Sequence, residues 1–250
     1  MKISPKMPAL LAGAALLFST GCQKDTPTPT IPVVTGPISG YALADDENGA
    51  PIDRSGITVS VDNSTPKLSA TTDANGKYAF DNVPAGTYNL TFAKTGLGTF
   101  RRLSVAHLGG PDPTFLGNTT LSQPSGTVVS GLSVTGPANN GNLMVQVTAT
   151  NVNSAAVQRV AVFVSSSTNP TATTGTLLGT YAVVTSGTTS TISLKPADLR
   201  GAGFAAGAQV YAVAYGAPAT NPSYVDPATG RTTYPDLNTT ASPTLSFLAP

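Results

Sequence analysis

The sequence is poor in the side chains that build most catalytic and metal centres. Its 250 residues include one cysteine, one histidine and no tryptophan, and Glu47 is the only glutamate. With so few, neither an internal disulfide nor a zinc site of several histidine or cysteine ligands can be built. A Ser–His–Asp triad would have to use His107, yet no Gly-x-Ser-x-Gly elbow is present. We therefore expect no enzyme activity, no metal ion and no cofactor, and we expect His107 at a strand end or in a loop.

Charge is also scarce. Charged residues make up only 10% of the chain, with 13 Lys and Arg against 12 Asp and Glu. Without Lys2 and Lys6, which belong to the predicted signal peptide described next, 11 basic residues face 12 acidic ones. This near-neutral balance argues against nucleic acid as a partner. Abundant Thr, Ser, Gly and Val instead favour strands joined by turns.

The N-terminal residues have the pattern of a secretory signal. Lys2 and Lys6 precede an apolar segment, residues 9–18, that is interrupted only by Gly13. This segment suits the core of a signal peptide, because a membrane-spanning helix needs roughly 20 apolar residues. The sequence therefore predicts a signal peptide over residues 1–21 and no transmembrane helix.

The end of that segment carries a further motif. Ser19-Thr20-Gly21-Cys22 resembles the lipobox of bacterial lipoproteins, with Ser19 where that family prefers leucine. The resemblance implies cleavage before Cys22 and acylation of its thiol, hence a membrane partner reached through lipid. An ordinary secretory signal with an incidental cysteine is the alternative. Residues 23–25 resemble the export signal of surface lipoproteins in Bacteroidetes-type bacteria. Together these resemblances imply the bacterial cell envelope, at the outer membrane, with surface exposure left open.

A spacer follows the cysteine. Residues 26–32 alternate proline with threonine over much of their length. Proline fixes φ, so such a run favours extended conformations. We therefore predict that residues 22–35 form a flexible Pro/Thr linker behind the lipidated Cys22.

Residues 36–122 have the apolar alternation of short strands. Ile57, Val59 and Val61 alternate with Thr58 and Ser60, and the same period of two continues further along the unit. Its other members are Tyr78 and Phe80, then Tyr88, Leu90 and Phe92, then Leu103 and Val105. Residues 73–76 and 84–86 supply turns between them. Six or seven strands at this spacing predict a β-sandwich.

Three stretches of this unit resemble the carboxypeptidase regulatory-like domain. They are Gly40-Tyr41-Ala42-Leu43 with Asp46, Gly49 and Pro51, then residues 72–80, then residues 83–88. The order of turn, strand and turn carries the resemblance. It implies a prealbumin-like sandwich of seven strands that is usually a non-catalytic accessory module.

Residues 123–250 form the second predicted unit, with residues 123–126 as the boundary. Residues 143–148, 189–194, 209–215 and 244–248 predict strands, and residues 157–164 are apolar on both faces, as in a central strand. Residues 196–200 predict one helical turn with proline near its start. The unit loosely resembles an immunoglobulin or fibronectin type III module. The chain is therefore predicted to be all-β, with two antiparallel β-sandwich domains.

Acidic residues gather at two turns. Asp45, Asp46 and Glu47 precede Gly49, and Asp73 and Asn75 precede Gly76. Calcium prefers six to eight such oxygen ligands. Turns ending in glycine use the same residues without any ion, and we favour that interpretation. These five residues therefore remain weak calcium candidates.

One constellation could contact a ligand. Tyr224, Asp226, Arg231 and Tyr234 lie close together in sequence, with Asp236 just beyond them. An exposed tyrosine with Arg and Asp could stack on a sugar and hydrogen-bond to it. The alternative, which we favour, is a long hairpin whose tyrosines pack on the edge of the sandwich.

We expect a non-catalytic, lipid-anchored envelope protein for display, docking or binding. Its partner would be an envelope protein or a glycan, and the alternative role is a glycan-binding accessory of a polysaccharide-uptake system.

Overall fold

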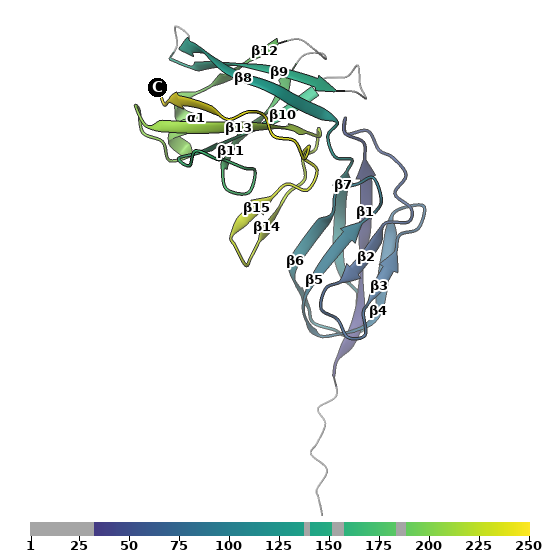
Figure 1. Ribbon diagram of the computed structural model, residues 1–250. Helices are drawn as coiled ribbons and strands as arrows, with labels where there is room; N and C mark the ends of the chain where they lie inside the picture. Colours follow the sequence, from purple (N-terminus) through teal and green to yellow (C-terminus); the bar gives the residue numbers. More distant parts are fainter. Residues whose placement is uncertain (1–32, 138–140, 152–157, 184–188) are drawn as a thin grey trace, which may run out of the picture. The chain divides into compact units, whose positions relative to one another are not determined.

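The computed structural model describes residues 33–137, 141–151, 158–183 and 189–250. The predicted signal peptide, Cys22 and nearly all of the predicted linker lie outside these residues. Val33–Pro250 forms one compact unit, and in its described residues the regular secondary structure is strand except for one short helix (Figure 1). The prediction of an all-β chain is therefore confirmed. No helix in the described part of the chain is long and apolar enough to cross a membrane.

Seven strands form the first sandwich, in two sheets. The strands are β1 (Thr35–Asp45), β2 (Thr58–Val61), β3 (Ser69–Thr71), β4 (Lys77–Pro84), β5 (Gly86–Ala93), β6 (Phe100–His107) and β7 (Thr114–Ser122). One sheet has the order β4-β1-β7 and the other β3-β2-β5-β6. The predicted count of six or seven strands is confirmed.

One pair of strands departs from the predicted antiparallel pattern. β1 pairs with β7 in parallel, from Ile38 opposite Thr114 to Asp45 opposite Ser122. Parallel neighbours need a long connection, and here the connection is the rest of the sandwich. The first sandwich is therefore mixed rather than purely antiparallel, and β7 becomes the edge of its sheet.

The core of the first sandwich lies between its two sheets. The predicted alternation places Val59, Val61, Leu90 and Phe92 inside from one sheet, and all four are buried. The other sheet contributes the residues that complete this cluster, among them Ile38, Ala42, Tyr78, Phe80, Val83 and Leu121. Burial of these apolar faces against each other is the main source of stability, since no disulfide is available.

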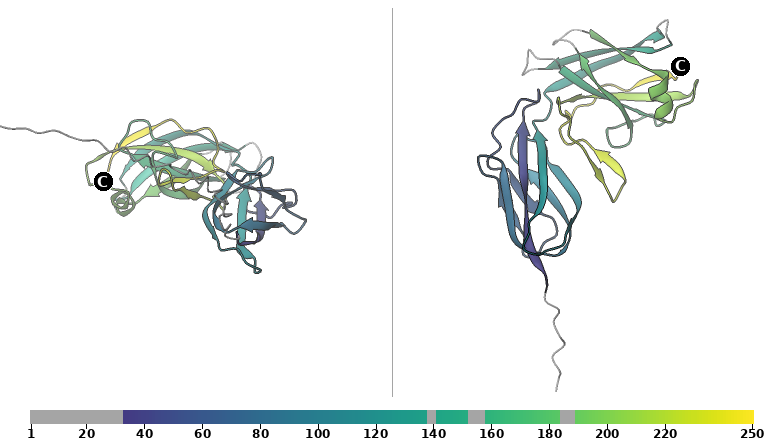
Figure 2. Two further views of the ribbon diagram at one scale, coloured as in Figure 1. Left: turned by 90° about the horizontal axis from the view of Figure 1, so that it is seen from below. Right: turned by 180° about the vertical axis from the view of Figure 1, so that it is seen from behind.

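The second half of the chain contains a second two-sheet arrangement (Figures 1 and 2). One sheet has the order β12-β9-β8 and the other β11-β10-β13-β16. The strands are β8 (Thr127–Pro137), β9 (Leu143–Asn151), β10 (Gln158–Ser165), β11 (Thr176–Val183), β12 (Thr189–Leu194), β13 (Gln209–Ala217) and β16 (Leu245–Leu248). A short hairpin of β14 (Tyr224–Asp226) and β15 (Arg231–Thr233) precedes β16. The predicted helical turn is α1 (Pro196–Gly201), with proline in its first turn as expected.

β10 is the central strand that the sequence predicts. It pairs with β11 on one side and β13 on the other. One of its faces packs Val160, Val162 and Val164 into the core between the two sheets. Its other face packs Ala161 and Phe163 against a second apolar cluster that includes Leu237 and the partly buried Tyr234. Both faces are covered, which explains why residues 160–164 are all apolar.

The predicted boundary at residues 123–126 falls between β7 and β8, outside any strand. Hydrogen bonds connect this stretch to both halves of the chain. Gly126 N donates to Glu47 Oε2 at 2.7 Å, and Ser125 N donates to Asp236 O at 3.0 Å. The division into two domains at this point stays a prediction.

Candidate functional site

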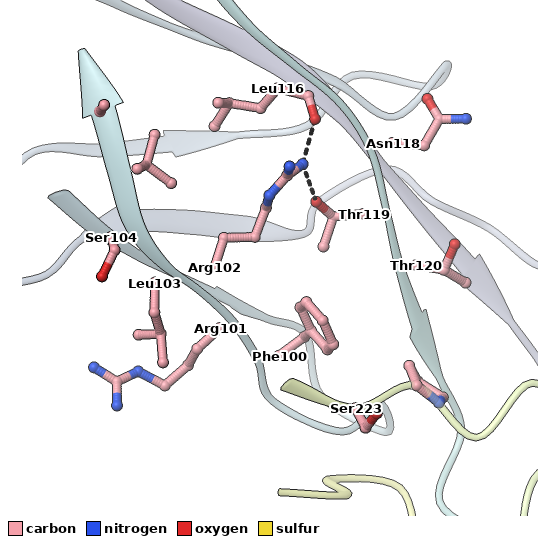
Figure 3. Close-up of a pocket in the computed structure, with 13 residues that line it drawn as sticks. Phe100, Arg101, Arg102, Leu103, Ser104, Leu116, Asn118, Thr119, Thr120 and Ser223 are labelled. Carbon is pink, nitrogen blue, oxygen red and sulfur yellow. Dashed lines mark hydrogen bonds between the residues drawn. The ribbon is translucent and has the colours of Figure 1, made fainter. Parts of the chain in front are cut away.

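A cavity lies between the free edges of β6 and β7. It has a volume of about 640 Å³. Its walls are residues 100–106 of β6, residue 116 and residues 118–120 of β7, and the loop residues Pro222 and Ser223 (Figure 3). Successive side chains of a strand point to opposite faces of the sheet. Seven consecutive residues of β6 can therefore line the same cavity only if the cavity lies along the open edge of the strand. The cavity is therefore a groove between two sheet edges.

Both edges carry a bulge at the groove. In β6 an extra residue opposes β5 near Ser104, whose φ is 55°. In β7 an extra residue opposes β1 at Gly117, whose φ is 65°. Asn89 Oδ1 accepts the Ser104 N–H at 2.9 Å, which satisfies the bulged backbone. Bulges bend an edge and spoil its hydrogen-bonding ladder. These edges therefore expose side chains to a ligand more readily than they pair with another strand.

Arg102 spans the groove. Figure 3 shows its side chain reaching from β6 toward β7, where Nη1 donates to Leu116 O and lies 3.4 Å from Thr119 Oγ1. Arg102 is partly buried, and within the described residues no carboxylate lies within ion-pair distance of it. Burial raises the pKa of the nearby Tyr78 to about 12, and the charge of Arg102 offsets part of that rise. A guanidinium has five N–H donors, so most of those of Arg102 remain for a ligand.

Arg101 faces away from Arg102 (Figure 3). Its Nη2 lies 2.7 Å from Asp62 Oδ2 in an ion pair, and Thr91 Oγ1 donates to Asp62 Oδ1 at 2.8 Å. The hydrogen bond to Asp62 raises the pKa of Arg101. The two neighbouring arginines therefore differ. One is neutralised by a carboxylate, and the other lines the groove without such a partner in the described residues.

The remaining lining is neutral. Ser104, Asn118, Thr119, Thr120 and Ser223 bring hydroxyl and amide groups. Phe100, Leu103, Val105, Ala106, Leu116 and Pro222 bring apolar surface, and no Asp or Glu is among the lining residues. The groove thus combines one unpaired cation with hydrogen-bonding groups and apolar contacts.

The four sequence-predicted ligand contacts lie on and beside the β14–β15 hairpin. Tyr224 packs edge-on against Phe100 at a centroid distance of 5.4 Å, and Tyr234 packs likewise against Phe163 at 5.4 Å. Asp226 Oδ1 accepts the Ala228 N–H at 2.9 Å, and Arg231 Nη1 donates to Thr173 O at 3.0 Å. These segments form a hairpin whose tyrosines pack against neighbouring rings, which is the alternative that we favoured from the sequence. Ligand contact by these four residues stays a prediction.

The acidic candidates are engaged in their own turns. Asp46 Oδ1 accepts the N–H groups of Asn48 and Ala50, each at 2.8 Å. Asp73 Oδ1 accepts those of Asn75 and Lys77 at 2.8 and 2.9 Å.

The remaining acids of the first cluster also have neighbours of their own. Glu47 bonds to the Gly126 N–H, and burial followed by the charge of Asp46 raises the pKa of Asp45. In the part of the chain that the structure describes, no three His, Cys, Asp or Glu side chains gather as a metal site would require.

His107 ends β6, as predicted, and is 2% exposed. Its Nε2 lies 3.0 Å from Val83 O and therefore donates, while Nδ1 lies 2.7 Å from Thr114 Oγ1 and accepts from that hydroxyl. Both ring nitrogens are thus used to hold β6 against its neighbours. This arrangement gives the histidine a structural role.

Among the described residues, Asp236 is the one acid that is deeply buried. Only 1% of it is exposed. Burial raises its pKa to about 7, although the backbone N–H groups of Ser122 and Gly98 oppose that rise. The carboxyl lies so close to Gly98 that a Cβ there would overlap Oδ1. The sequence placed Asp236 beside a ligand site, whereas the structure places it in the interior.

Part of the chain is similar to a known family. Residues 38–115 match the carboxypeptidase regulatory-like domain. The match confirms the resemblance predicted from the three sequence stretches and runs from β1 into β7. The β6 wall of the groove lies inside this regulatory-like region, whereas residues 116–120 of the β7 wall follow it directly. No match was found among curated proteins.

Solved structures that match parts or most of this chain come from several bacteria. A cohesin–X-dockerin complex of Acetivibrio cellulolyticus has 22% identity and a TM-score of 0.30. The match covers 36% of this chain and 59% of that one. A Bacteroides uniformis protein, for which carbohydrate binding is proposed, has 13% identity and a TM-score of 0.30. That match covers 86% of this chain and 99% of the other. A DUF3823 family protein of Parabacteroides merdae has 11% identity and a TM-score of 0.29. That match covers 86% of this chain and 100% of the other. The proposals below therefore rest on the geometry of this chain.

The sequence missed the groove because its two walls come from different sheets. One signal was available, because Arg101-Arg102 is the only adjacent pair of basic residues in a chain with few charges. The sequence does not indicate which of the two arginines would be neutralised, since Asp62 is 39 residues away from Arg101 along the chain.

Proposed function

We propose that this protein is a non-catalytic binding module of the bacterial cell envelope, anchored by lipid on Cys22. The groove between β6 and β7 would be its binding surface. The observation that carries the proposal is the cavity of about 640 Å³, open along two bulged sheet edges and lined by hydrogen-bonding side chains around Arg102. Concave sites with a few convergent polar groups on an apolar background are the usual form of ligand pockets.

Glycan is the ligand class that the groove supports best. Hydroxyl and amide groups from Ser104, Asn118, Thr119, Thr120 and Ser223 match the donors and acceptors of sugar hydroxyls, and Phe100 and Leu116 add apolar contacts. An extended peptide would gain most from a regular edge, and the bulges at Ser104 and Gly117 interrupt both edges. The role as accessory to a polysaccharide-uptake system is the corresponding finer proposal.

Replacing Asn118 by alanine is expected to weaken glycan binding about 3- to 10-fold. A net hydrogen bond contributes roughly 0.5–1.5 kcal/mol, and about 1.4 kcal/mol corresponds to a factor of ten. Binding of the detergent-purified full chain to a glycan array, followed by titration of the best hits, measures this. Asn75→Ala is the matched control, because Asn75 is an exposed asparagine in a turn outside the groove. Equal loss in both variants, or no glycan bound at all, contradicts the glycan proposal.

The anchor is tested separately. Cells labelled with palmitate are expected to yield a labelled wild-type protein and an unlabelled Cys22→Ala variant that leaves the membrane fraction. Each buried methylene of an acyl chain contributes about 0.8 kcal/mol, so two or more chains hold a protein stably at a membrane. Equal labelling of the two proteins would end the anchor proposal and leave the groove untouched.

A further inference from the structure

We infer that the groove between β6 and β7 selects glycans that carry a carboxylate, with the guanidinium of Arg102 as the group that recognises it. The inference rests on the proposed function, because it names the ligand class of the same site. Its oligosaccharide would contain uronic acid residues, whose carboxylate lies on the sugar ring itself.

The charge of the groove supports an anionic ligand. Arg101 and Arg102 are the only charged residues that line it, and Asp62 neutralises Arg101 at 2.7 Å. Arg102 keeps its charge facing the cavity, with no carboxylate within ion-pair distance in the described part of the chain. A partly buried cation without a counter-charge is costly, and a ligand carboxylate would remove that cost. The groove is therefore locally positive in a chain whose charges nearly balance.

The geometry of Arg102 supports a planar anion. Its Nη1 is held by Leu116 O and lies near Thr119 Oγ1, both on β7, so the guanidinium is oriented before a ligand arrives. The remaining N–H donors lie in the same plane, and a guanidinium matches the two oxygens of a carboxylate with two parallel hydrogen bonds. Because its orientation is already fixed, little side-chain freedom is lost when the carboxylate binds.

The rest of the lining supports a sugar as the carrier of that carboxylate. Asn118 and Thr120 also line the groove from β7, and Figure 3 draws their side chains on the other side of that strand from Arg102. Their amide and hydroxyl groups would therefore meet hydroxyls of a sugar chain that crosses the edge of β7, away from the ring that carries the carboxylate. An acidic peptide would instead place its backbone along β6 or β7, where the bulges at Ser104 and Gly117 break the ladder.

Oligogalacturonates, oligoglucuronates and alginate oligomers, each compared with its methyl ester, test the inference. The ester keeps the sugar and removes only the charge. Titration calorimetry of the detergent-purified full chain is expected to show at least one acid binding tenfold or more tightly than its ester. Rising salt concentration should weaken the binding of the acid and leave that of the ester unchanged, because only the charged pair is screened.

Three variants locate the preference. Arg102→Gln should abolish the difference between acid and ester, and Arg102→Lys should retain part of it. Arg200→Gln should leave it intact, because Arg200 is an exposed arginine on α1 outside the groove. If Arg102→Lys keeps the melting temperature of the wild type, its weaker binding of the acid does not come from a loss of stability when the hydrogen bond from Arg102 to β7 is removed. Equal binding of acid and ester, or an acid preference that survives Arg102→Gln, overturns the inference. Neutral glycans that bind more tightly than every acid tested, with binding weakened in Asn118→Ala, would overturn it too, while the proposed function would stand.

Discussion

Replacing Asp236 by asparagine is expected to raise the melting temperature by about 10 °C at pH 8 and to change it little at pH 4. Asp236 is 1% exposed, and the backbone N–H groups of Ser122 and Gly98 offset only part of the cost of burying its carboxylate. Burial therefore raises its pKa from 3.8 to about 7 in the folded chain. Asparagine has nearly the same shape and carries no charge, so it fills the same space without the cost of a buried anion.

The sign of the pH dependence follows from where the proton binds more tightly. Between pH 4 and pH 7 the folded chain keeps the Asp236 proton, whereas the unfolded chain releases it. Stability of the wild type therefore falls as the pH rises through this window and levels off above it. At 1.36 kcal/mol per pH unit, the loss amounts to about 4 kcal/mol by pH 8, which corresponds to roughly 8–16 °C in a chain of this size.

Calorimetric scans of wild type and Asp236→Asn between pH 4 and pH 8 measure this difference. Burial is the cause of the raised pKa of Asp236, and the backbone N–H groups of Ser122 and Gly98 offset part of it. Asp112→Asn is the matched control, since Asp112 is an exposed acid in the turn before β7. A difference in melting temperature that is the same at pH 4 and pH 8 would contradict the assignment of a buried, protonated carboxyl.

Replacing Phe163 by alanine is expected to cost about 3–5 kcal/mol of unfolding free energy. Phe163 is fully buried on β10 and makes edge-on contacts with Tyr215 at 5.8 Å and Tyr234 at 5.4 Å. Removing a buried phenyl ring loses its transfer free energy and leaves a cavity between the sheet and the segment that follows β15. The variant should therefore lose both overall stability and the fixed position of Tyr234.

Urea unfolding followed by far-UV circular dichroism measures the cost, because the chain has no tryptophan to report by fluorescence. Phe115→Ala is the control, since Phe115 is 61% exposed and should cost well under 1 kcal/mol. Proteolysis within the β14–β15 hairpin should also become faster in Phe163→Ala alone. A loss no larger than that of the control would show that the second apolar cluster contributes little to stability.

Strands with an unbroken period of two were the most predictable, whereas three of the bulged strands were missed. β2, β5 and β12 alternate regularly, and the sequence places them within a residue or two. β7 and β11 each carry one extra residue and β8 carries two, which shifts the apolar positions from one face to the other part-way along the strand. Their glycines and serines also read as turns. These three strands were missed for that reason.

The hairpin that carries Tyr224 and precedes Tyr234 shows that the exposure of candidate binding residues is also hard to predict from sequence. Its turn residues, Asp226 to Gly230, are visible in sequence. Whether its tyrosines face solvent or pack inward depends on Phe100 and Phe163, which lie far away in the chain. In the structure both tyrosines contact these rings.

The sequence by itself determined the chemistry that is available. One cysteine and one histidine exclude a zinc site of several histidine or cysteine ligands, and the alternation of Val, Ile, Tyr and Phe with Thr and Ser dictates strands. Side-chain inventory and a period of two are local properties, so they can be read without a fold.

Only the tertiary structure decided where that chemistry lies. The parallel pairing of β1 with β7 leaves β7 at the edge of its sheet, and the order of the other sheet leaves β6 at its edge. Those two free edges create the groove, give Arg102 its place in it and leave Arg101 to Asp62. The same long-range packing buries Asp236 beside Gly98. Strand order and burial depend on contacts between residues distant in sequence, and no local pattern specifies them.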